Sequence, residues 1–241
     1  MRNLFTNVIQ IIKEKRFIFL NKFVISLNTY NEINNLFKWT LNPIINDQNI
    51  LDYQYIEDVN QRRLRDAESI CSVARNIMPK TCLEIGTGTG HITSLIAINA
   101  PDSLIYTVNI PPEDFFQGGK YTTMKLEREQ IGSLYKKQNL TNINQIFANT
   151  ANWEPNLGNI DFAFIDGCHD TDFVYNDTKK ILKNMKSGSF ILWHDFNLDL
   201  VEKYPWIKSV CLGIENLYAD GLLNGPIFHI RDSWVGIYRK P

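Results

Sequence analysis

Short apolar runs alternate with helix-like patterns along most of the chain. Seven runs have the length and continuity of β-strands, and the last two are joined by a short turn that indicates a hairpin. They cover residues 81–85, 104–110, 143–148, 160–165, 190–193, 226–230 and 234–238. Runs that are apolar at nearly every position, such as residues 162–165 and 190–193, indicate strands buried on both faces of a sheet.

Apolar residues at helical spacing predict helices between these strands. The predicted helices cover residues 57–78, 90–100, 123–138, 171–185 and 210–218. The first has one apolar face, formed by Ala67, Ile70, Val73, Ala74 and Ile77. The alternation of strand and helix predicts an α/β fold: a doubly wound, mostly parallel seven-stranded sheet with helices on both faces and a C-terminal antiparallel hairpin.

The first 55 residues differ from the rest, because they contain no glycine and a single proline, Pro43. We expect an N-terminal helical extension over residues 1–55, serving as a lid, a dimer arm or a surface helix, and a main domain over residues 56–241. The apolar patches at 8–12 and 17–20 are separated by four charged residues, and neither reaches the ~18 residues of a membrane-spanning helix. The sequence therefore predicts no transmembrane span and no signal peptide, and a homo-oligomer through this segment is compatible with it.

The charge balance of the 241-residue chain limits its partners. Lys and Arg number 25 and Asp and Glu 26, so the net charge is -1, which does not favour a nucleic-acid partner. The four cysteines form no Cys-x-x-Cys pair, so we expect reduced thiols in a cytoplasmic protein rather than a structural zinc site.

A glycine-rich turn follows the first predicted strand of the main domain. Gly86, Gly88 and Gly90 stand at every second position, which lets the backbone approach a ligand closely. A dinucleotide fingerprint would place its third glycine at position 91, which is His91. Glu84, two residues before the first glycine, disfavours a pyrophosphate and suits the ammonium group of a ligand.

The spacing Glu-x-Gly-x-Gly-x-Gly over residues 84–90 resembles the first motif of class I S-adenosylmethionine-dependent methyltransferases. The resemblance extends roughly over residues 57–240 and includes the final hairpin. It implies a Rossmann-like methyltransferase fold and S-adenosylmethionine as cofactor, with the loop, including Thr87, around its methionine part. The family has acidic residues after the second and third strands, for the ribose hydroxyls and the adenine amino group. Asn109 and Asn149 occupy these positions, and amides can form such hydrogen bonds.

Ionisable residues follow the fourth and fifth predicted strands of the main domain. Asp166 and His169 follow one strand, and His194 and Asp195 follow the next. Because ligands bind at the carboxyl ends of parallel strands, we expect these four catalytic candidates to meet beside the glycine loop. Asp166, which directly follows its strand, is also expected to contribute to the cofactor site.

The pattern Ile-Asp-Gly-x-His, followed by a helix, a Ser-Gly turn and a His-Asp pair, resembles the branch of the family related to catechol and macrocin O-methyltransferases. In its metal-dependent members, the positions of Asp166, His194 and Asp195 hold a divalent ion. Imidazole suits manganese, zinc or iron better than magnesium. Two interpretations follow: a bound transition metal or a weakly held magnesium ion activates the acceptor hydroxyl, or His194 or His169 acts as a general base without metal. We favour the metal, because two facing carboxylates repel unless a cation lies between them.

The sequence thus predicts an O-methyltransferase that uses S-adenosylmethionine and acts on a hydroxyl of a small molecule of sugar or natural-product type. Aromatic residues within 111–121 and 197–206 are candidates for the acceptor pocket. Two alternatives stay open: a metal-dependent hydroxylase-like relative on the same fold, and a non-catalytic binding protein that has lost the cofactor. The amides at positions 109 and 149 motivate the second alternative.

Overall fold

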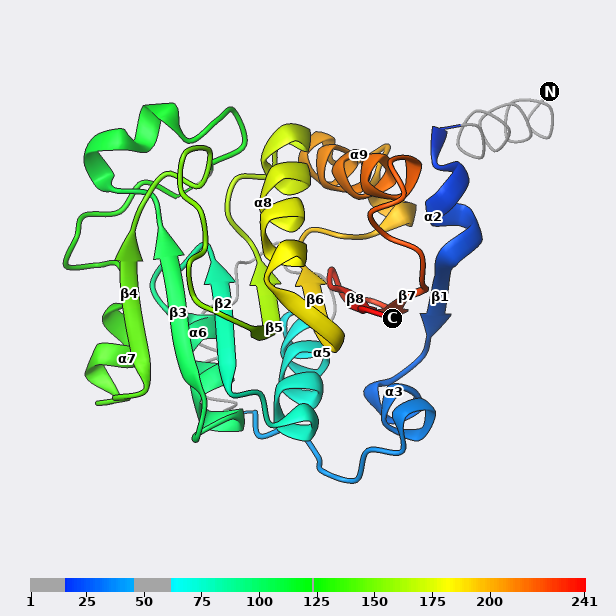
Figure 1. Ribbon diagram of the computed structural model, residues 1–241, viewed down its shortest axis with the longest axis horizontal. Helices are drawn as coiled ribbons and strands as arrows, with labels where there is room; N and C mark the ends of the chain where they lie inside the picture. The colour runs from blue at the N-terminus through cyan, green and yellow to red at the C-terminus, as the bar shows by residue number, and fades with distance from the viewer. Residues whose placement is uncertain (1–15, 46–61, 123) are drawn as a thin grey trace.

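The computed structural model describes residues 16–45, 62–122 and 124–241. These residues form one eight-stranded sheet in the order β1-β7-β8-β6-β5-β2-β3-β4 (Figure 1). The strands are β1 Val24–Leu27, β2 Thr81–Ile85, β3 Leu104–Asn109, β4 Ile143–Phe147, β5 Ile160–Ile165, β6 Met185–Trp193, β7 Ile227–Ile230 and β8 Gly236–Arg239. Within this sheet β8 alone is antiparallel to its neighbours. The predicted doubly wound α/β fold with a C-terminal antiparallel hairpin is confirmed.

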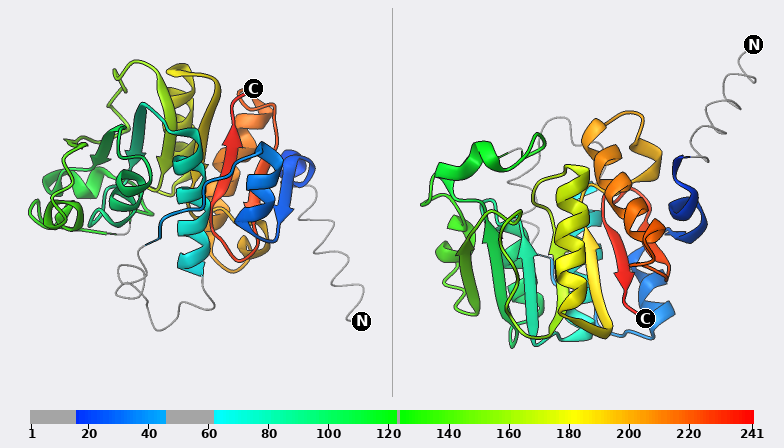
Figure 2. Two further views of the ribbon diagram at one scale, coloured as in Figure 1. Left: turned by 90° about the horizontal axis from the view of Figure 1, so that it is seen from below. Right: turned by 45° about the horizontal axis from the view of Figure 1, so that its top comes forward.

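Helices cover both faces of the sheet (Figures 1 and 2). One core cluster joins the sheet to α2, α8 and α9, and a second joins the opposite face to α3, α5 and α6. The helices are α2 Ile18–Phe23, α3 Tyr30–Phe37, α5 Arg62–Ile77, α6 His91–Asn99, α7 Ser133–Lys137, α8 Thr171–Lys183 and α9 Pro205–Ala219, with 3-10 turns η1 Pro112–Gln117 and η2 Leu198–Leu200. This layering explains the continuously apolar strands, because successive side chains enter opposite cores. In β5, Ala163 joins the first cluster, and Phe162 and Phe164 join the second.

The eighth strand comes from the segment expected to be a helical extension. Residues 16–45 contain α2, β1 and α3, and β1 pairs in parallel with β7. Glu215 of α9 fixes this segment, since its carboxylate accepts hydrogen bonds of 2.9 Å from the backbone N–H groups of Phe19 and Leu20. The sheet therefore has eight strands rather than seven, because β1 covers an edge of β7 that would otherwise be open. The expected domain boundary at residues 55–56 lies outside the described residues.

The predicted helix over residues 123–138 is wrong for most of its length, since α7 is the only helix in the described residues 124–138. Gly132 has a φ of +68°, a left-handed conformation outside the helical range. Its N–H donates to the carbonyl of Gly88 at 3.0 Å, and the N–H of Leu134 donates to the carbonyl of Thr89 at 3.0 Å. This segment thus buttresses the glycine loop, and those tertiary hydrogen bonds replace the helical ones that its periodicity predicts.

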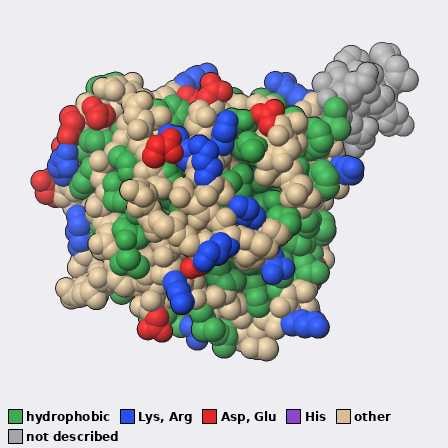
Figure 3. Space-filling model, viewed as in Figure 1, with side chains coloured by type: hydrophobic (Ala, Val, Ile, Leu, Met, Phe, Trp, Pro, Cys, Tyr) green, Lys and Arg blue, Asp and Glu red, His purple; other side chains and the backbone are tan. Residues whose placement is uncertain are grey.

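None of the helices in the described ranges has the length and apolar character needed to span a bilayer. On the face shown in Figure 3, basic and acidic side chains are scattered among apolar and uncharged ones. This face of the molecule therefore presents a mixed surface rather than a continuous basic one.

Candidate active site

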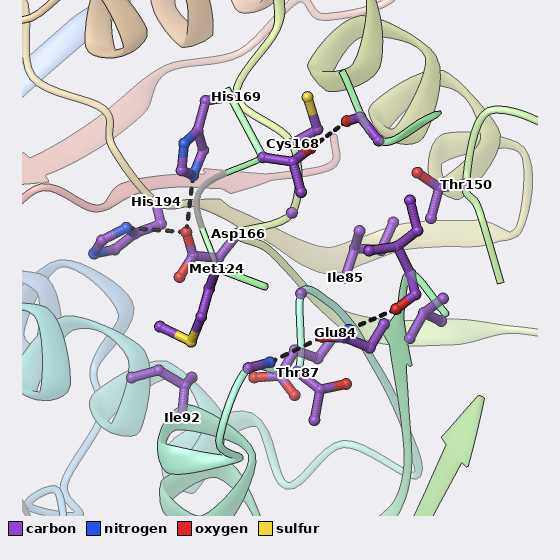
Figure 4. Close-up of a pocket in the computed structure, with 18 of the residues that line it drawn as sticks. Glu84, Ile85, Thr87, Ile92, Met124, Thr150, Asp166, Cys168, His169 and His194 are labelled. Carbon is purple, nitrogen blue, oxygen red and sulfur yellow. Dashed lines mark hydrogen bonds and ion pairs between the residues drawn. The ribbon is translucent and has the colours of Figure 1, made fainter. Parts of the chain in front are cut away.

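A cavity of about 370 Å³ opens at the carboxyl ends of β2, β3, β5 and β6. It joins the glycine loop to the ionisable residues that follow β5 and β6 (Figure 4). Among the residues that line it are Glu84, Gly86, Thr87, Gly88, Asn109, Asn149, Asp166, His169, His194 and Asp195. The cavity thus brings together most of the residues singled out from the sequence. Gly90 is the exception, since it lies behind the loop at the start of α6.

The three glycines of the loop are required for different reasons, although all have positive φ. A Cβ on Gly86 would lie 2.0 Å from the backbone oxygen of Asp166, and one on Gly90 would lie 2.7 Å from the ring of Tyr135. The nearest atom to a Cβ on Gly88 would be a methionine sulfur at 3.7 Å. Gly86 and Gly90 therefore serve packing within the protein, whereas Gly88 borders space that a ligand can enter.

Glu84 is a buried carboxylate with one oxygen still unpartnered. Its Oε2 accepts 2.5 Å hydrogen bonds from the hydroxyls of Thr93 and Thr107, while Oε1 has no hydrogen-bond partner within the described part of the chain. Thr107 in turn lies 2.7 Å from the hydroxyl of Thr87, which accepts from Gln145 at 2.9 Å. The hydroxyl of Thr87 is therefore engaged within the protein. Burial raises the pKa of Glu84 to about 8, although the two threonine hydrogen bonds oppose the shift.

Both asparagines of the predicted cofactor site line the cavity, but their amides hold the local backbone. The Oδ1 of Asn109 accepts from the N–H of Gly88 at 3.1 Å, and its Nδ2 donates to the next carbonyl at 2.8 Å. The Oδ1 of Asn149 accepts from the N–H of Ala151 at 3.0 Å, and its Nδ2 donates to the carbonyl of Gln117 at 3.3 Å. Their direct contact with a cofactor stays a prediction.

Asp166, His169, His194 and Asp195 meet in one cluster at the other end of the cavity. The Nε2 of His169 lies 3.0 Å from Asp195 Oδ2 and 3.3 Å from Asp166 Oδ1. The Nδ1 of His194 lies 3.1 Å from Asp166 Oδ1 and 3.2 Å from Asp195 Oδ2. Each imidazole therefore lies between the same two carboxylates, as Figure 4 shows for Asp166.

The proximity of these groups controls their protonation. Burial by itself lowers the pKa of His194, but the charges of Asp166 and Asp195 outweigh it and hold that pKa well above its usual value. Burial also lowers the pKa of His169, but the same two carboxylates outweigh this effect, so the pKa of His169 is raised as well. Burial would raise the pKa of each aspartate, but the imidazoles keep both below the usual value. Protonated histidines thus supply the positive charge that two facing carboxylates need.

The same cluster has donors suited to a divalent metal. Asp166, His169 and Asp195 each offer one ligand atom, and these atoms lie within 4.8 Å of one another. A set of two carboxylate oxygens and one imidazole fits manganese, iron or zinc better than magnesium. The sequence analysis expected His194 as the imidazole of this set, whereas the group in the structure contains His169. His194 contacts the two carboxylates through Nδ1, while its Nε2 lies 3.3 Å from Asp66.

Asp66 of α5 is a site residue that the sequence analysis missed. It is 3% exposed, and its Oδ1 accepts from the N–H of Trp234 at 2.7 Å and the hydroxyl of Ser233 at 3.0 Å. Its Oδ2 binds Arg62 at 2.8 Å and faces His194. The sequence did hold one signal, because a carboxylate on the buried face of an amphipathic helix requires a buried partner.

An aromatic cluster lies beside the acidic end of the cavity. The indole N–H of Trp206 donates to Asp195 Oδ1 at 3.1 Å. The ring of Tyr204 lies 4.8 Å from Trp206 and 5.5 Å from Trp234, whose ring lies 6.5 Å from that of His194. Tyr204 and Trp206 belong to the aromatic candidates in residues 197–206, and the structure places both next to the cluster of ionisable residues.

A mostly parallel α/β sheet with a glycine loop, and with ionisable residues at the ends of adjacent strands, is the arrangement in which ligands bind at the carboxyl edge of the sheet. The family model described as "Methyltransferase domain" matches residues 83–196, from β2 to just beyond β6. This part of the chain is thus similar to methyltransferase domains. The resemblance to class I S-adenosylmethionine-dependent methyltransferases and the prediction of a methyltransferase are confirmed. No curated protein matches the chain.

Solved structures of methyltransferases share the fold at low sequence identity. The O-methyltransferase TomG from Streptomyces achromogenes, in complex with S-adenosylmethionine, is 13% identical with a TM-score of 0.55, covering 88% of this chain and 97% of its own. The methyltransferase PaMTH1 from Podospora anserina, bound to S-adenosylhomocysteine, is 17% identical with a TM-score of 0.53, covering 88% and 94%. At these identities the likeness establishes the fold.

Proposed function

We propose that this protein transfers the methyl group of S-adenosylmethionine to a hydroxyl of a small-molecule acceptor. The proposal depends on one observation above all. A single cavity connects the glycine loop, with its unpartnered Glu84 oxygen, to the cluster of two histidines and two aspartates. The loop end is suited to a cationic sulfonium cofactor, and the cluster end is suited to removing a proton from a hydroxyl.

The residues of the chain divide the work of the reaction between the two ends of the cavity. When bound, S-adenosylmethionine supplies a methyl group already activated by its positive sulfur. The glycine loop and Glu84 hold that donor, and the cluster holds the acceptor oxygen in line with it. Asp166 and Asp195 raise the pKa of both histidines, so the neutral imidazole of His169 or His194 that accepts the hydroxyl proton becomes populated as the pH rises. The same two carboxylates stabilise the imidazolium that results.

We further propose that Asp166, His169 and Asp195 can hold a divalent transition metal. Their donor atoms and spacing support this assignment. When bound, the ion would supply a Lewis acid that lowers the pKa of the acceptor hydroxyl. The histidines themselves provide positive charge at the same place. The alternative is therefore methyl transfer without a metal, with a histidine as general base, and experiment has to distinguish the two mechanisms.

The acceptor is proposed to carry a sugar or phenolic ring. The partly exposed rings of Tyr204, Trp206 and Trp234 lie beside the acid–base cluster, where they can stack on such a ring. We also propose a cytoplasmic location and a homo-oligomer formed through the N-terminal segment.

The test begins with calorimetric titration of S-adenosylhomocysteine into the purified protein, followed by assays with S-adenosylmethionine and a panel of phenols, catechols and sugars. We expect binding, and methylated product detected by mass spectrometry. Asp195→Asn should lower kcat by about 100-fold or more while the cofactor still binds. Dialysis against a chelator, with metal content measured before and after, tests the metal. Absence of cofactor binding at millimolar concentration would refute the proposal, and binding without turnover of any acceptor would favour a binding protein.

A further inference from the structure

The connection between β4 and β5 forms one wall of the cavity, although it contains no helix or strand. Residues 148–159 leave β4 at the end of the sheet order and return across β3 and β2 to β5. Figure 1 shows this connection passing in front of the sheet beside α8. Ala148, Asn149 and Thr150 line the cavity. A long irregular connection at a binding site needs side-chain contacts to hold it in place.

Lys180 of α8 supplies such contacts. Its ammonium group donates to three backbone carbonyls of the connection: Thr150 at 2.7 Å, Trp153 at 2.9 Å and Ala151 at 3.2 Å. A lysine ammonium has three N–H donors, so these bonds use its full capacity. The side chain is only 14% exposed, and charged hydrogen bonds of this kind are stronger than neutral ones.

A second side chain of α8 holds the same residue. Asp177 lies one turn before Lys180 and accepts a hydrogen bond of 3.2 Å from the hydroxyl of Thr150. Thr150 is therefore bound through both its carbonyl and its hydroxyl, and Figure 4 shows it at the wall of the cavity. Burial raises the pKa of Asp177 to about 7, so its charge changes near neutral pH and Lys180 is the cleaner residue to substitute.

The helix that carries these two residues is itself firmly packed. Thr178, between them in sequence, accepts a 2.9 Å hydrogen bond from the indole of Trp193 at the end of β6. Val174 and Ile181 of the same helix are buried in the core cluster. α8 can therefore serve as a fixed support for the connection.

We propose that Lys180 is a positioning residue for the cofactor: it holds the Asn149–Thr150 wall of the cavity in the conformation that binds S-adenosylmethionine. This inference rests on the proposed function. Lys180 lies outside the cavity lining and reaches the cofactor site only through the backbone of the connection. Its loss should therefore weaken cofactor binding without removing any group that acts on the reacting atoms.

The test compares Lys180→Met with Lys179→Met, a matched control at an exposed position on the same helix. Calorimetry should show Kd for S-adenosylhomocysteine raised about tenfold in Lys180→Met and unchanged in Lys179→Met. The KM for S-adenosylmethionine should rise similarly while kcat at saturation stays within about twofold. Lys180→Arg, which keeps the charge, should restore part of the affinity. An unchanged Kd in folded Lys180→Met, or an equal change in Lys179→Met, would overturn the inference.

Hydrogen exchange of the cofactor-free protein separates this inference from the proposed function. Lys180→Met should exchange faster than wild type over residues 148–154, while the strands of the sheet stay protected. Equal exchange in that segment would show that Lys180 does not position it. If wild type binds no S-adenosylhomocysteine, the proposed function fails, and the cofactor role of Lys180 fails with it. Faster exchange in Lys180→Met would then show only that Lys180 stabilises the structure of residues 148–154.

Discussion

Replacing Glu84 by glutamine should change how cofactor binding depends on pH. The carboxyl is buried and Glu84 lines the cavity, its Oε1 has no hydrogen-bond partner among the described residues, and its pKa is raised to about 8. If the ammonium group of the cofactor needs the ionised carboxylate, binding must release a proton whenever the pH lies below that value. Ionising Glu84 at pH 7 then costs about 1.4 kcal/mol of binding free energy.

The expected size follows from the ionised fraction. With a pKa of about 8, that fraction is roughly 3% at pH 6.5 and roughly three quarters at pH 8.5, so Kd for S-adenosylhomocysteine should fall about 25-fold over this range. Calorimetry in two buffers of different ionisation enthalpy should also detect the released proton. In Glu84→Gln the Kd should be nearly constant with pH, since glutamine still accepts from Thr93 and Thr107.

Protein stability gives an independent measurement of the same group. Between the ordinary pKa of 4.5 and about 8, the folded protein holds a proton that the unfolded chain releases. The contribution of Glu84 to the free energy of unfolding therefore falls as pH rises, by up to about 1.4 kcal/mol per pH unit. Glu84→Gln should become more stable relative to wild type between pH 6 and pH 8. A wild-type Kd that does not vary with pH, together with a constant stability difference, would refute the argument.

Three further substitutions test the packing around the site. Gly86→Ala should abolish soluble folded protein, because its Cβ would overlap a backbone oxygen at 2.0 Å, whereas Gly88→Ala should fold and lose cofactor affinity; circular dichroism and calorimetry distinguish them. Glu215→Ala should lower the free energy of unfolding by about 2 kcal/mol, since two backbone N–H groups lose their acceptor, and a denaturation midpoint equal to wild type would contradict this. Trp206→Phe removes the donor to Asp195, so kcat should fall with little change in Kd for the cofactor; a change confined to Kd would contradict this role.

The sequence predicted most of the architecture because the signals for it are local. Continuous apolar runs indicated β5 and β6, and residues 162–165 are buried as expected of strands covered on both faces. Those signals failed where a tertiary partner replaced local structure. Gly132 and Leu134 donate to the glycine loop rather than to a helix over residues 123–138, and β1 forms because β7 offers it an edge.

The candidate site was likewise predictable where its signals are local in the sequence. The glycine spacing, and the position of Asp166 and His194 directly after strands, placed the chemistry at one edge of the sheet, because parallel strands end on the same side. Asp66 and Lys180 gave no comparable signal. Asp66 lies on a helix that precedes the glycine motif, far in sequence from its partner His194. Lys180 binds backbone carbonyls, which every residue has, so no partner side chain in the sequence indicates its role.

The sequence by itself determined the succession of strands from β2 to β8, the glycine loop and which ionisable residues follow β5 and β6, since each depends on neighbours in the chain. The tertiary structure decided which imidazole nitrogen faces which carboxylate, that Gly86 packs on a backbone oxygen while Gly88 borders the cavity, and that Lys180 holds a distant connection. These contacts join residues far apart in the sequence. Their geometry depends on how the helices and strands pack against one another, and hydrophobic periodicity does not specify that packing.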